Sequence, residues 1–184
     1  VVEGKLKAGD KVLLLGTGGV SIYALQIAKA MGAYVAITSS SDEKLEKAKA
    51  LGADFIVNYK AEPEWGSAVN AWSGEKGVDH VVEVGGPATL AQSINACRVN
   101  GNIVLIGVLT GVKGDVPTAA LMAKQINLKG IIVGSREHQN DFVNALEASG
   151  IKPVIDTSFS LDELAKAFEY EVNGKHFGKI CIDI

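Results

Sequence analysis

The chain has 184 residues, of which 47% are apolar, and it carries a formal net charge of −3. This length and composition fit one domain with one sizeable core, and the lack of a basic run argues against a nucleic-acid partner. The longest apolar stretches fall far short of the roughly 20 residues that cross a bilayer, and no targeting segment is visible. We therefore expect a cytoplasmic globular protein without nucleic-acid or membrane partners.

A glycine turn follows the first predicted strand. The run KVLLL (11–15) enters GTGGVS (16–21), after which apolar residues recur at helical spacing. Gly16 allows a sharp turn, Gly18 allows the backbone to approach phosphates, and the following helix would direct free N–H groups at them. Ser21 replaces the third glycine of the G-x-G-x-x-G pattern and is small enough for close packing. The turn is thus a predicted diphosphate site, formed by Gly16, Thr17, Gly18, Gly19 and Val20.

Strands and helices alternate along the rest of the first 150 residues. Further strands are predicted at residues 33–40, 54–59, 78–86, 102–107 and 127–134. Helices are predicted at residues 42–51, 64–72, from Pro87 to about residue 97, at 117–124 and at 136–149, with a glycine-spaced loop at 107–116. Apolar strands separated by helical crossovers are typical of a parallel sheet covered on both faces. We therefore predict a Rossmann-type, doubly wound α/β fold with about six strands.

The last part of the chain predicts one more helix and a closing strand. Residues 161–172 have an apolar helical face, and Ile180, Ile182 and Ile184 alternate with polar or small residues. We expect a single domain over residues 1–184, with a core at about 6–150 and a C-terminal helix and strand at 151–184. The apolar face of that strand is expected to pack against another domain.

Four strings resemble one enzyme family, and the resemblance extends from about Leu6 to the last residue. They are GTGGVS, TSSSDEKLEKAKALGADFIVNY, GVDHVVEVGG and GKHFGKI. Together they resemble the cofactor-binding half of the medium-chain dehydrogenase/reductase family, which includes zinc-type alcohol dehydrogenases and quinone oxidoreductases. The resemblance implies a parent oxidoreductase that transfers hydride to or from an alcohol, aldehyde, ketone, quinone or enone. It also implies that this chain is the cofactor half of a longer enzyme, inactive by itself, whose other half holds the small-molecule substrate.

The sequence predicts neither a catalytic residue nor a metal site in this chain. Cys97 and Cys181 are far apart and are accompanied by only three histidines, so reduced thiols are expected. His80 lies in an apolar strand and is interpreted as a core residue. The family's zinc ligands have no counterpart here, which leaves open whether the parent enzyme binds zinc.

The end of the second strand favours NADP(H) over NAD(H). NAD sites place a carboxylate there, whereas this strand ends in residues with hydroxyl side chains. Their hydroxyls and the backbone N–H groups can donate to a phosphate, and Lys44 can supply a positive charge. By resemblance to quinone oxidoreductases, Ser40, Lys44 and Tyr59 match residues that contact the 2′-phosphate, and Ser39 is included with them. Alternatives remain: Ser40 and Glu43 could form a capping box, Lys44 could be solvated, and the Asp42 carboxylate could turn toward the ribose.

The ends of the later strands supply the remaining candidates. Gly85 and Gly86 are expected to flank the adenosine, and Glu83 is interpreted as either a buried acceptor or a ribose contact. His176 and Lys179 could face another domain, which is the favoured interpretation, and the alternative from the family pattern is that Lys179 approaches the cofactor. By resemblance, two strand ends hold the nicotinamide ring, with the residues Ile106, Gly107, Val108, Val133, Gly134 and Ser135.

The resemblance also predicts a homodimer through the sixth strand, where Ile131 to Val133 have β-branched character. A stand-alone NADP(H)-sensing module is the main alternative function. A methyltransferase is disfavoured because the second strand does not end in a carboxylate. A short-chain dehydrogenase is disfavoured because the chain has no Tyr-x-x-x-Lys pair.

Overall fold

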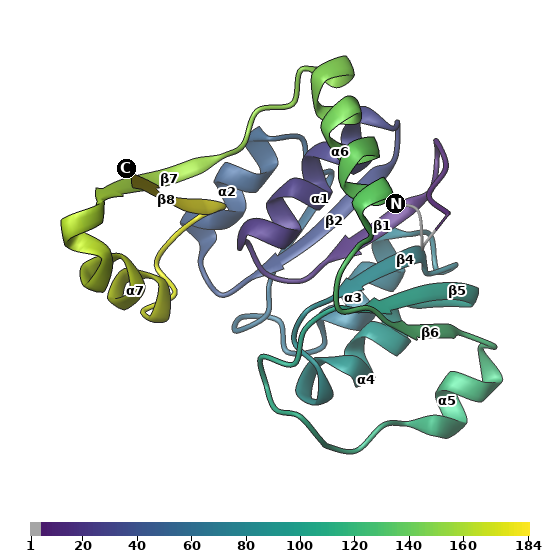
Figure 1. Ribbon diagram of the computed structural model, residues 1–184. Helices are drawn as coiled ribbons and strands as arrows, with labels where there is room; N and C mark the ends of the chain where they lie inside the picture. Colours follow the sequence, from purple (N-terminus) through teal and green to yellow (C-terminus); the bar gives the residue numbers. More distant parts are fainter. Residues whose placement is uncertain (1–4) are drawn as a thin grey trace.

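The computed structural model describes residues 5–184, which form a six-stranded parallel sheet with helices on both faces (Figure 1). The strand order is β3-β2-β1-β4-β5-β6. The strands are β1 (Lys11–Leu14), β2 (Tyr34–Ser39), β3 (Phe55–Asn58), β4 (Val78–Glu83), β5 (Cys97–Leu105) and β6 (Asn127–Gly130). This order, with β1 at the centre and β4 next to it, is that of dinucleotide-binding folds, so the predicted fold class is confirmed.

Two buried clusters hold the helices against the sheet. Successive side chains of a strand face opposite sides, so Leu13 packs in the cluster with α3 (Trp65–Trp72) and α4 (Pro87–Ala96). Leu14 packs in the cluster with α1 (Gly19–Ala30) and α2 (Asp42–Ala50). The short α5 (Thr118–Ala123) precedes β6, and α6 (Arg136–Ser149) contacts α1 through an edge-on ring pair of Tyr23 and Phe142. Within residues 5–184, no helix has the length and apolar content needed to span a bilayer.

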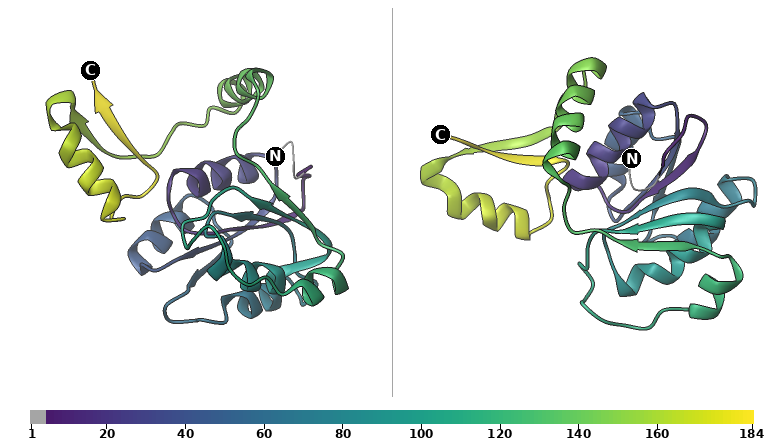
Figure 2. Two further views of the ribbon diagram at one scale, coloured as in Figure 1. Left: turned by 60° about the horizontal axis from the view of Figure 1, so that its bottom comes forward. Right: turned by 45° about the vertical axis from the view of Figure 1, so that its right-hand side comes forward.

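The C-terminal segment forms a separate small layer beside the main sheet (Figure 2). The strand β7 (Ile155–Ser160) pairs in parallel with β8 (Lys179–Asp183), and α7 (Leu164–Val172) follows a 3₁₀ turn at Leu161–Glu163. The closing strand and its helix were predicted, whereas β7 was not. The turn before β8 returns to the main sheet, because the Gly178 N–H donates to the Thr17 carbonyl at 3.0 Å.

Two predicted strand boundaries are wrong. The sixth strand ends at Gly130, so Ile131 to Val133 lie beyond it. The Ile131 N–H still donates to the Leu105 carbonyl at 2.9 Å, after which the chain turns toward α6 and Val133 is 80% exposed. The fifth strand begins at Cys97, earlier than predicted, because its first residues pair with the start of β4.

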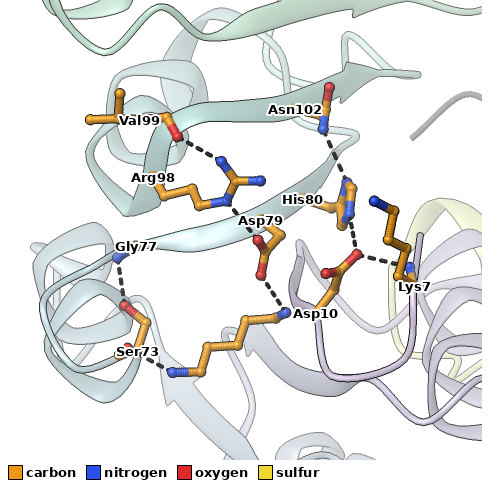
Figure 3. Close-up of polar contacts among 10 residues, drawn as sticks. Lys7, Asp10, Ser73, Gly77, Asp79, His80, Arg98, Val99 and Asn102 are labelled. Atoms are coloured by element: carbon orange, nitrogen blue, oxygen red, sulfur yellow. Dashed lines mark hydrogen bonds and ion pairs between the residues drawn. The ribbon is translucent and has the colours of Figure 1, made fainter. Parts of the chain in front are cut away.

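Polar side chains are closely paired at the amino edge of the sheet (Figure 3). The His80 Nε2 lies 2.9 Å from an Asp10 carboxylate oxygen, and the imidazole is 7% exposed, as expected for a core histidine. Asp79 accepts from the Arg98 Nε at 2.6 Å and from the Lys11 N–H at 2.8 Å. These bonds join β1, β4 and β5 at the end of the sheet opposite the glycine turn.

Candidate functional site

The glycine turn after β1 has the geometry that a phosphate site requires. Gly16 has φ +73°, a left-handed conformation that glycine adopts without strain, and its N–H donates to the Thr38 hydroxyl at 3.2 Å. Gly18 is the N-cap of α1 and provides no side-chain cap, so the first N–H groups of the helix are left for a ligand. The Ser21 hydroxyl is buried and donates to the Leu15 carbonyl at 2.6 Å, which explains how serine replaces the third glycine.

The turn before β8 lies directly over this helix N-terminus. A Cβ atom added to Gly19 would lie 2.6 Å from the Lys179 Cε and 2.8 Å from its Nζ. A Cβ atom on Gly18 would lie 4.0 Å from the His176 Nε2. Within residues 5–184, Lys179 forms no ion pair with a carboxylate. Because a helix N-terminus repels a cation, this arrangement is favourable when an anion lies between the two.

A pocket of about 420 Å³ opens beside the turn at the carboxyl ends of β1 to β4. Three predicted site residues, Gly16, Tyr59 and Gly85, line it. The loop after β5 closes one side, because the Thr110 N–H and hydroxyl both donate to the Gly85 carbonyl, at 2.8 and 2.9 Å. Leu15, Thr38 and Val84 line the pocket at the ends of β1, β2 and β4. Sequence reasoning missed six further lining residues, which come from α3, α4 and the two loops that follow β3 and β5: Pro63, Trp65, Ala88, Thr89, Leu109 and Thr110.

The end of β2 shows which of its hydroxyls are used within the fold. Ser39 is buried, and its hydroxyl accepts from the Ser41 N–H at 3.3 Å. Ser41 is the N-cap of α2 and accepts from the Lys44 N–H at 3.4 Å, so a capping box at Ser40 is wrong. Ser40 is half-buried between them. The hydroxyl of Ser40 is therefore not needed to cap the helix.

The charged groups near this strand end are held in place. The Asp42 carboxylate accepts from the Asn58 side-chain amide at 2.7 Å, which directs it toward β3. The Lys44 Nζ donates to the Gly174 carbonyl at 2.6 Å, so Lys44 is not simply solvated. Partial burial lowers the pKa of the Lys44 ammonium, although the nearby Asp156 acts in the opposite direction.

Glu83 is a buried acceptor, and its interpretation as a ribose contact is wrong. The residue has no exposed surface. One carboxylate oxygen accepts from the N–H groups of Gly85 and Gly86, at 2.8 and 3.0 Å, and from the Thr89 hydroxyl at 2.6 Å. The other oxygen accepts from the Ser93 hydroxyl. Glu83 therefore fixes the turn that leads from β4 into α4.

The predicted nicotinamide-binding residues follow β5 and β6 at the same edge of the sheet. Gly107 lies close to the backbone of β4, and its N–H donates to the Glu83 carbonyl at 3.3 Å. Ile106 and Val108 are partly exposed beside it, and Val133 and Gly134 follow β6. Ser135 is the N-cap of α6: its hydroxyl accepts from the His138 N–H, and its own N–H donates to the His138 Nδ1.

Comparison with known proteins assigns the family. The family model described as zinc-binding dehydrogenase matches residues 19–168. The chain belongs to this family. Membership of the zinc-binding dehydrogenase family confirms the resemblance found in the sequence. Within residues 5–184, no group of three or more His, Cys, Asp or Glu side chains could hold a metal ion.

Several zinc-binding dehydrogenase relatives match almost the whole of this chain. A zinc-type alcohol dehydrogenase-like protein of Schizosaccharomyces pombe is 45% identical over 187 residues, which are 99% of this chain and 54% of the relative. The solved structure of an NAD-dependent alcohol dehydrogenase has a TM-score of 0.92 at 33% identity, covering 100% of this chain and 54% of that one. The 2-octenoyl-CoA carboxylase reductase CinF, solved with NADP and 2-octenoyl-CoA, has a TM-score of 0.89 at 25% identity, covering 97% of this chain and 44% of that one. The chain spans about half the length of the curated relatives it matches.

Proposed function

We propose that this chain binds a nicotinamide dinucleotide along the carboxyl edge of its main sheet. The observation that supports this most strongly is the position of Lys179 over Gly19, a cation held at a helix N-terminus, where a diphosphate would lie between them. The adjoining pocket of about 420 Å³ would take the adenosine. The ends of β5 and β6 would hold the nicotinamide, with Ile106 to Val108 on one side and Val133 to Ser135 on the other.

The chemistry of the whole protein is proposed from the same residues. A bound nicotinamide ring gives or accepts a hydride, while the protein orients it. The residues of this chain would fix the diphosphate and the adenosine, and thereby the position of the ring at the sheet edge. Two of the matched relatives are named as an alcohol dehydrogenase or as similar to one, which supports an oxidoreductase acting on an alcohol, aldehyde or ketone. A quinone or enone is the other substrate class that the family resemblance implies, and it stays a prediction.

The proposed cofactor is NADP(H) rather than NAD(H). The matched relatives include an NAD-dependent enzyme and one solved with NADP, so the choice rests on residues of this chain. The end of β2 carries hydroxyls, and the nearest carboxylate, that of Asp42, is bonded to Asn58. The Lys44 ammonium is held at this end by the Gly174 carbonyl and would supply positive charge to a 2′-phosphate. Tyr59 lines the pocket beside it.

The test of this preference is the Lys44→Ala variant, titrated with NADPH and with NADH. We expect NADPH affinity to fall by about tenfold or more, because a hydrogen bond to a charged group is lost, while NADH affinity changes by less than about threefold. Lys49→Ala, which removes an exposed lysine from the same helix, is the matched control and should leave both affinities unchanged. Equal losses of NADPH and NADH in Lys44→Ala would contradict the assignment.

We also propose a homodimer that extends the main sheet through β6. This strand is at one end of the six-stranded order, so one of its edges has no partner strand in the described chain. Ile132 is 93% exposed just beyond it. Sedimentation at high concentration tests the proposal: a dimer is expected, and Ile132→Lys should shift the chain toward the monomer.

A further inference from the structure

The turn between α7 and β8, residues 174–178, is anchored at three points. The Gly178 N–H donates to the Thr17 carbonyl at 3.0 Å, and Gly178 and Gly18 form a parallel bridge. Phe177 is 4% exposed and belongs to the buried cluster of α1 and α2. At the other end of the turn, the Gly174 carbonyl accepts from the Lys44 Nζ. The side chain next to Phe177 is therefore held in a defined place over the glycine turn.

That side chain is His176, and one of its two ring nitrogens, Nδ1, is not satisfied within the described chain. Its Nδ1 is buried and has no hydrogen-bond partner among residues 5–184. Its Nε2 lies beside Gly18, 4.0 Å from the position that a Cβ atom would take there. No hydrogen bond through Nδ1 fixes the ring within residues 5–184, and Nε2 is the ring nitrogen that lies over the glycine turn, where it can reach a ligand. The charged residues Lys179 of β8 and Glu171 of α7 line the same pocket as His176.

We propose that His176 is a cofactor-binding residue that contacts the diphosphate from the side opposite the N-terminus of α1. This inference rests on the proposed function and adds a residue to it. The imidazole would donate from Nε2 to a phosphate oxygen, while Lys179 would balance the charge of the diphosphate. A ring donor fixes the direction of its hydrogen bond, whereas a lysine ammonium acts mainly as a point charge. His176 would thus set where the diphosphate lies, and Lys179 how strongly its charge is held.

The experiment compares a ligand that has the diphosphate with one that lacks it. The purified 184-residue chain and its variants are titrated calorimetrically with NADPH and with adenosine 2′-monophosphate, which keeps the adenosine and the 2′-phosphate only. His176→Phe keeps a flat ring and removes both nitrogens. We expect His176→Phe to lower the affinity for NADPH by about tenfold or more and to change the affinity for adenosine 2′-monophosphate by less than about twofold.

Two further variants separate a contact from a structural role. His176→Gln can place a donor near the Nε2 position and should restore NADPH affinity to within about threefold, whereas the shorter His176→Asn should not. The Gln and Asn pair keeps the test valid if His176→Phe lowers the melting temperature. Lys175→Ala, on the exposed neighbour, is the control and should bind NADPH as the unaltered chain does.

Three results would overturn the inference on His176. The first is unchanged NADPH affinity in His176→Phe. The second is an equal loss of affinity for NADPH and for adenosine 2′-monophosphate in that variant. The third is an NADPH affinity of His176→Gln that is no higher than that of His176→Asn. These results leave the proposed function standing as long as the unaltered chain binds NADPH. If the unaltered chain binds neither NADPH nor NADH, the proposed function fails first, and the inference on His176 fails with it.

Discussion

The two edges of the main sheet differ in whether their polar side chains have partners within the fold. At the amino edge, acids and bases are joined: Asp79 bonds to Arg98, and Asp10 lies against His80. At the carboxyl edge, Lys179 lies near a helix N-terminus with no acidic partner in residues 5–184, and His176 has an unpartnered nitrogen. The amino edge is satisfied within the fold and stabilises it, while the unpaired groups of the carboxyl edge are the ones to which the proposed function assigns an anion.

Glycines follow the same division. At the carboxyl edge, Gly16 provides a left-handed turn, and Gly18 leaves its backbone open where a side chain would meet the ligand. At the amino edge, Gly77 lies so close to the backbone of β5 that an added Cβ would be 2.5 Å from the Arg98 nitrogen. In the proposed function Gly18 makes room for a ligand, whereas Gly77 makes room for a neighbouring strand.

The largest effect is expected from Gly18→Asp, which puts a carboxylate in the glycine turn. Gly18 has an ordinary φ of −78°, and an added Cβ has its nearest neighbour at 4.0 Å, so the fold should tolerate the change. Like charges about 4 Å apart repel by about 4 kcal/mol at an intermediate dielectric constant, so NADPH affinity should fall at least about a hundredfold. Calorimetry measures the affinity, and a melting curve checks that the variant remains folded. NADPH binding close to that of the unaltered chain would remove the diphosphate from this turn.

The amino edge should show the reverse pattern, with stability lost and affinity kept. Asp79→Asn breaks the ion pair with Arg98 and weakens the bond from the Lys11 N–H. We expect the free energy of unfolding in urea to fall by about 1–2 kcal/mol, since both groups are only partly buried, while NADPH affinity stays unchanged. Asp141→Asn, on an exposed face of α6, is the matched control and should alter neither quantity. If Asp79→Asn lowers the affinity for NADPH but not the free energy of unfolding, the amino edge binds the cofactor, contrary to this account.

The lowered pKa of Asp79 predicts how the free energy of unfolding depends on pH. Burial acts to raise the pKa of Asp79, but the Lys11 N–H and the Arg98 guanidinium together outweigh it, and the pKa lies below its ordinary value of 3.8. A carboxyl whose pKa is depressed by folding stabilises the protein above its unfolded pKa, and this contribution is lost as pH falls through the folded pKa. The difference in unfolding free energy between the unaltered chain and Asp79→Asn should therefore be constant above about pH 5 and shrink below about pH 4. A difference that grows on acidification would contradict the assignment.

The smallest effect concerns the two thiols. Cys97, at the start of β5, is fully buried, and burial raises its pKa to about 12. Cys181, on β8, is partly exposed. Because the thiolate is the reactive form, a thiol reagent at pH 8 should modify Cys181 and leave Cys97 intact until the chain unfolds. Peptide mapping after labelling checks this, and rapid labelling of Cys97 in the folded chain would show that the amino edge is more open than described.

Much of the main sheet could be predicted because its signals are local. The strands are short apolar runs, and Gly16 and Pro87 mark the starts of turns and helices near the positions observed. The second strand was predicted to end in hydroxyl side chains, and β2 ends at Ser39. The strand β7 was missed because IDTSFS has few apolar residues and its partner, β8, lies about 20 residues later. The alternating isoleucines predict β8 by itself, but nothing within IDTSFS indicates that it pairs with that strand.

The site was harder to predict where it depends on contacts distant in sequence. The glycine turn could be recognised from its own residues, but the approach of His176 and Lys179 to it depends on burying Phe177 against α1 and α2. Glu83 could not be assigned from sequence, because two of its four donors come from a turn whose shape the carboxylate itself sets and the other two are side chains of α4. Such residues become interpretable only when the backbone that they bond is known.

Calorimetric titration of NADPH and NADH into the folded, unaltered chain tests most directly whether the carboxyl edge binds a dinucleotide. We expect one molecule to bind per chain, with NADPH tighter than NADH, and affinity to fall as salt is added because the diphosphate meets cationic groups. If the folded chain gives no binding heat with either cofactor at any temperature tested, and no change in NADPH fluorescence, the carboxyl edge is not a dinucleotide site.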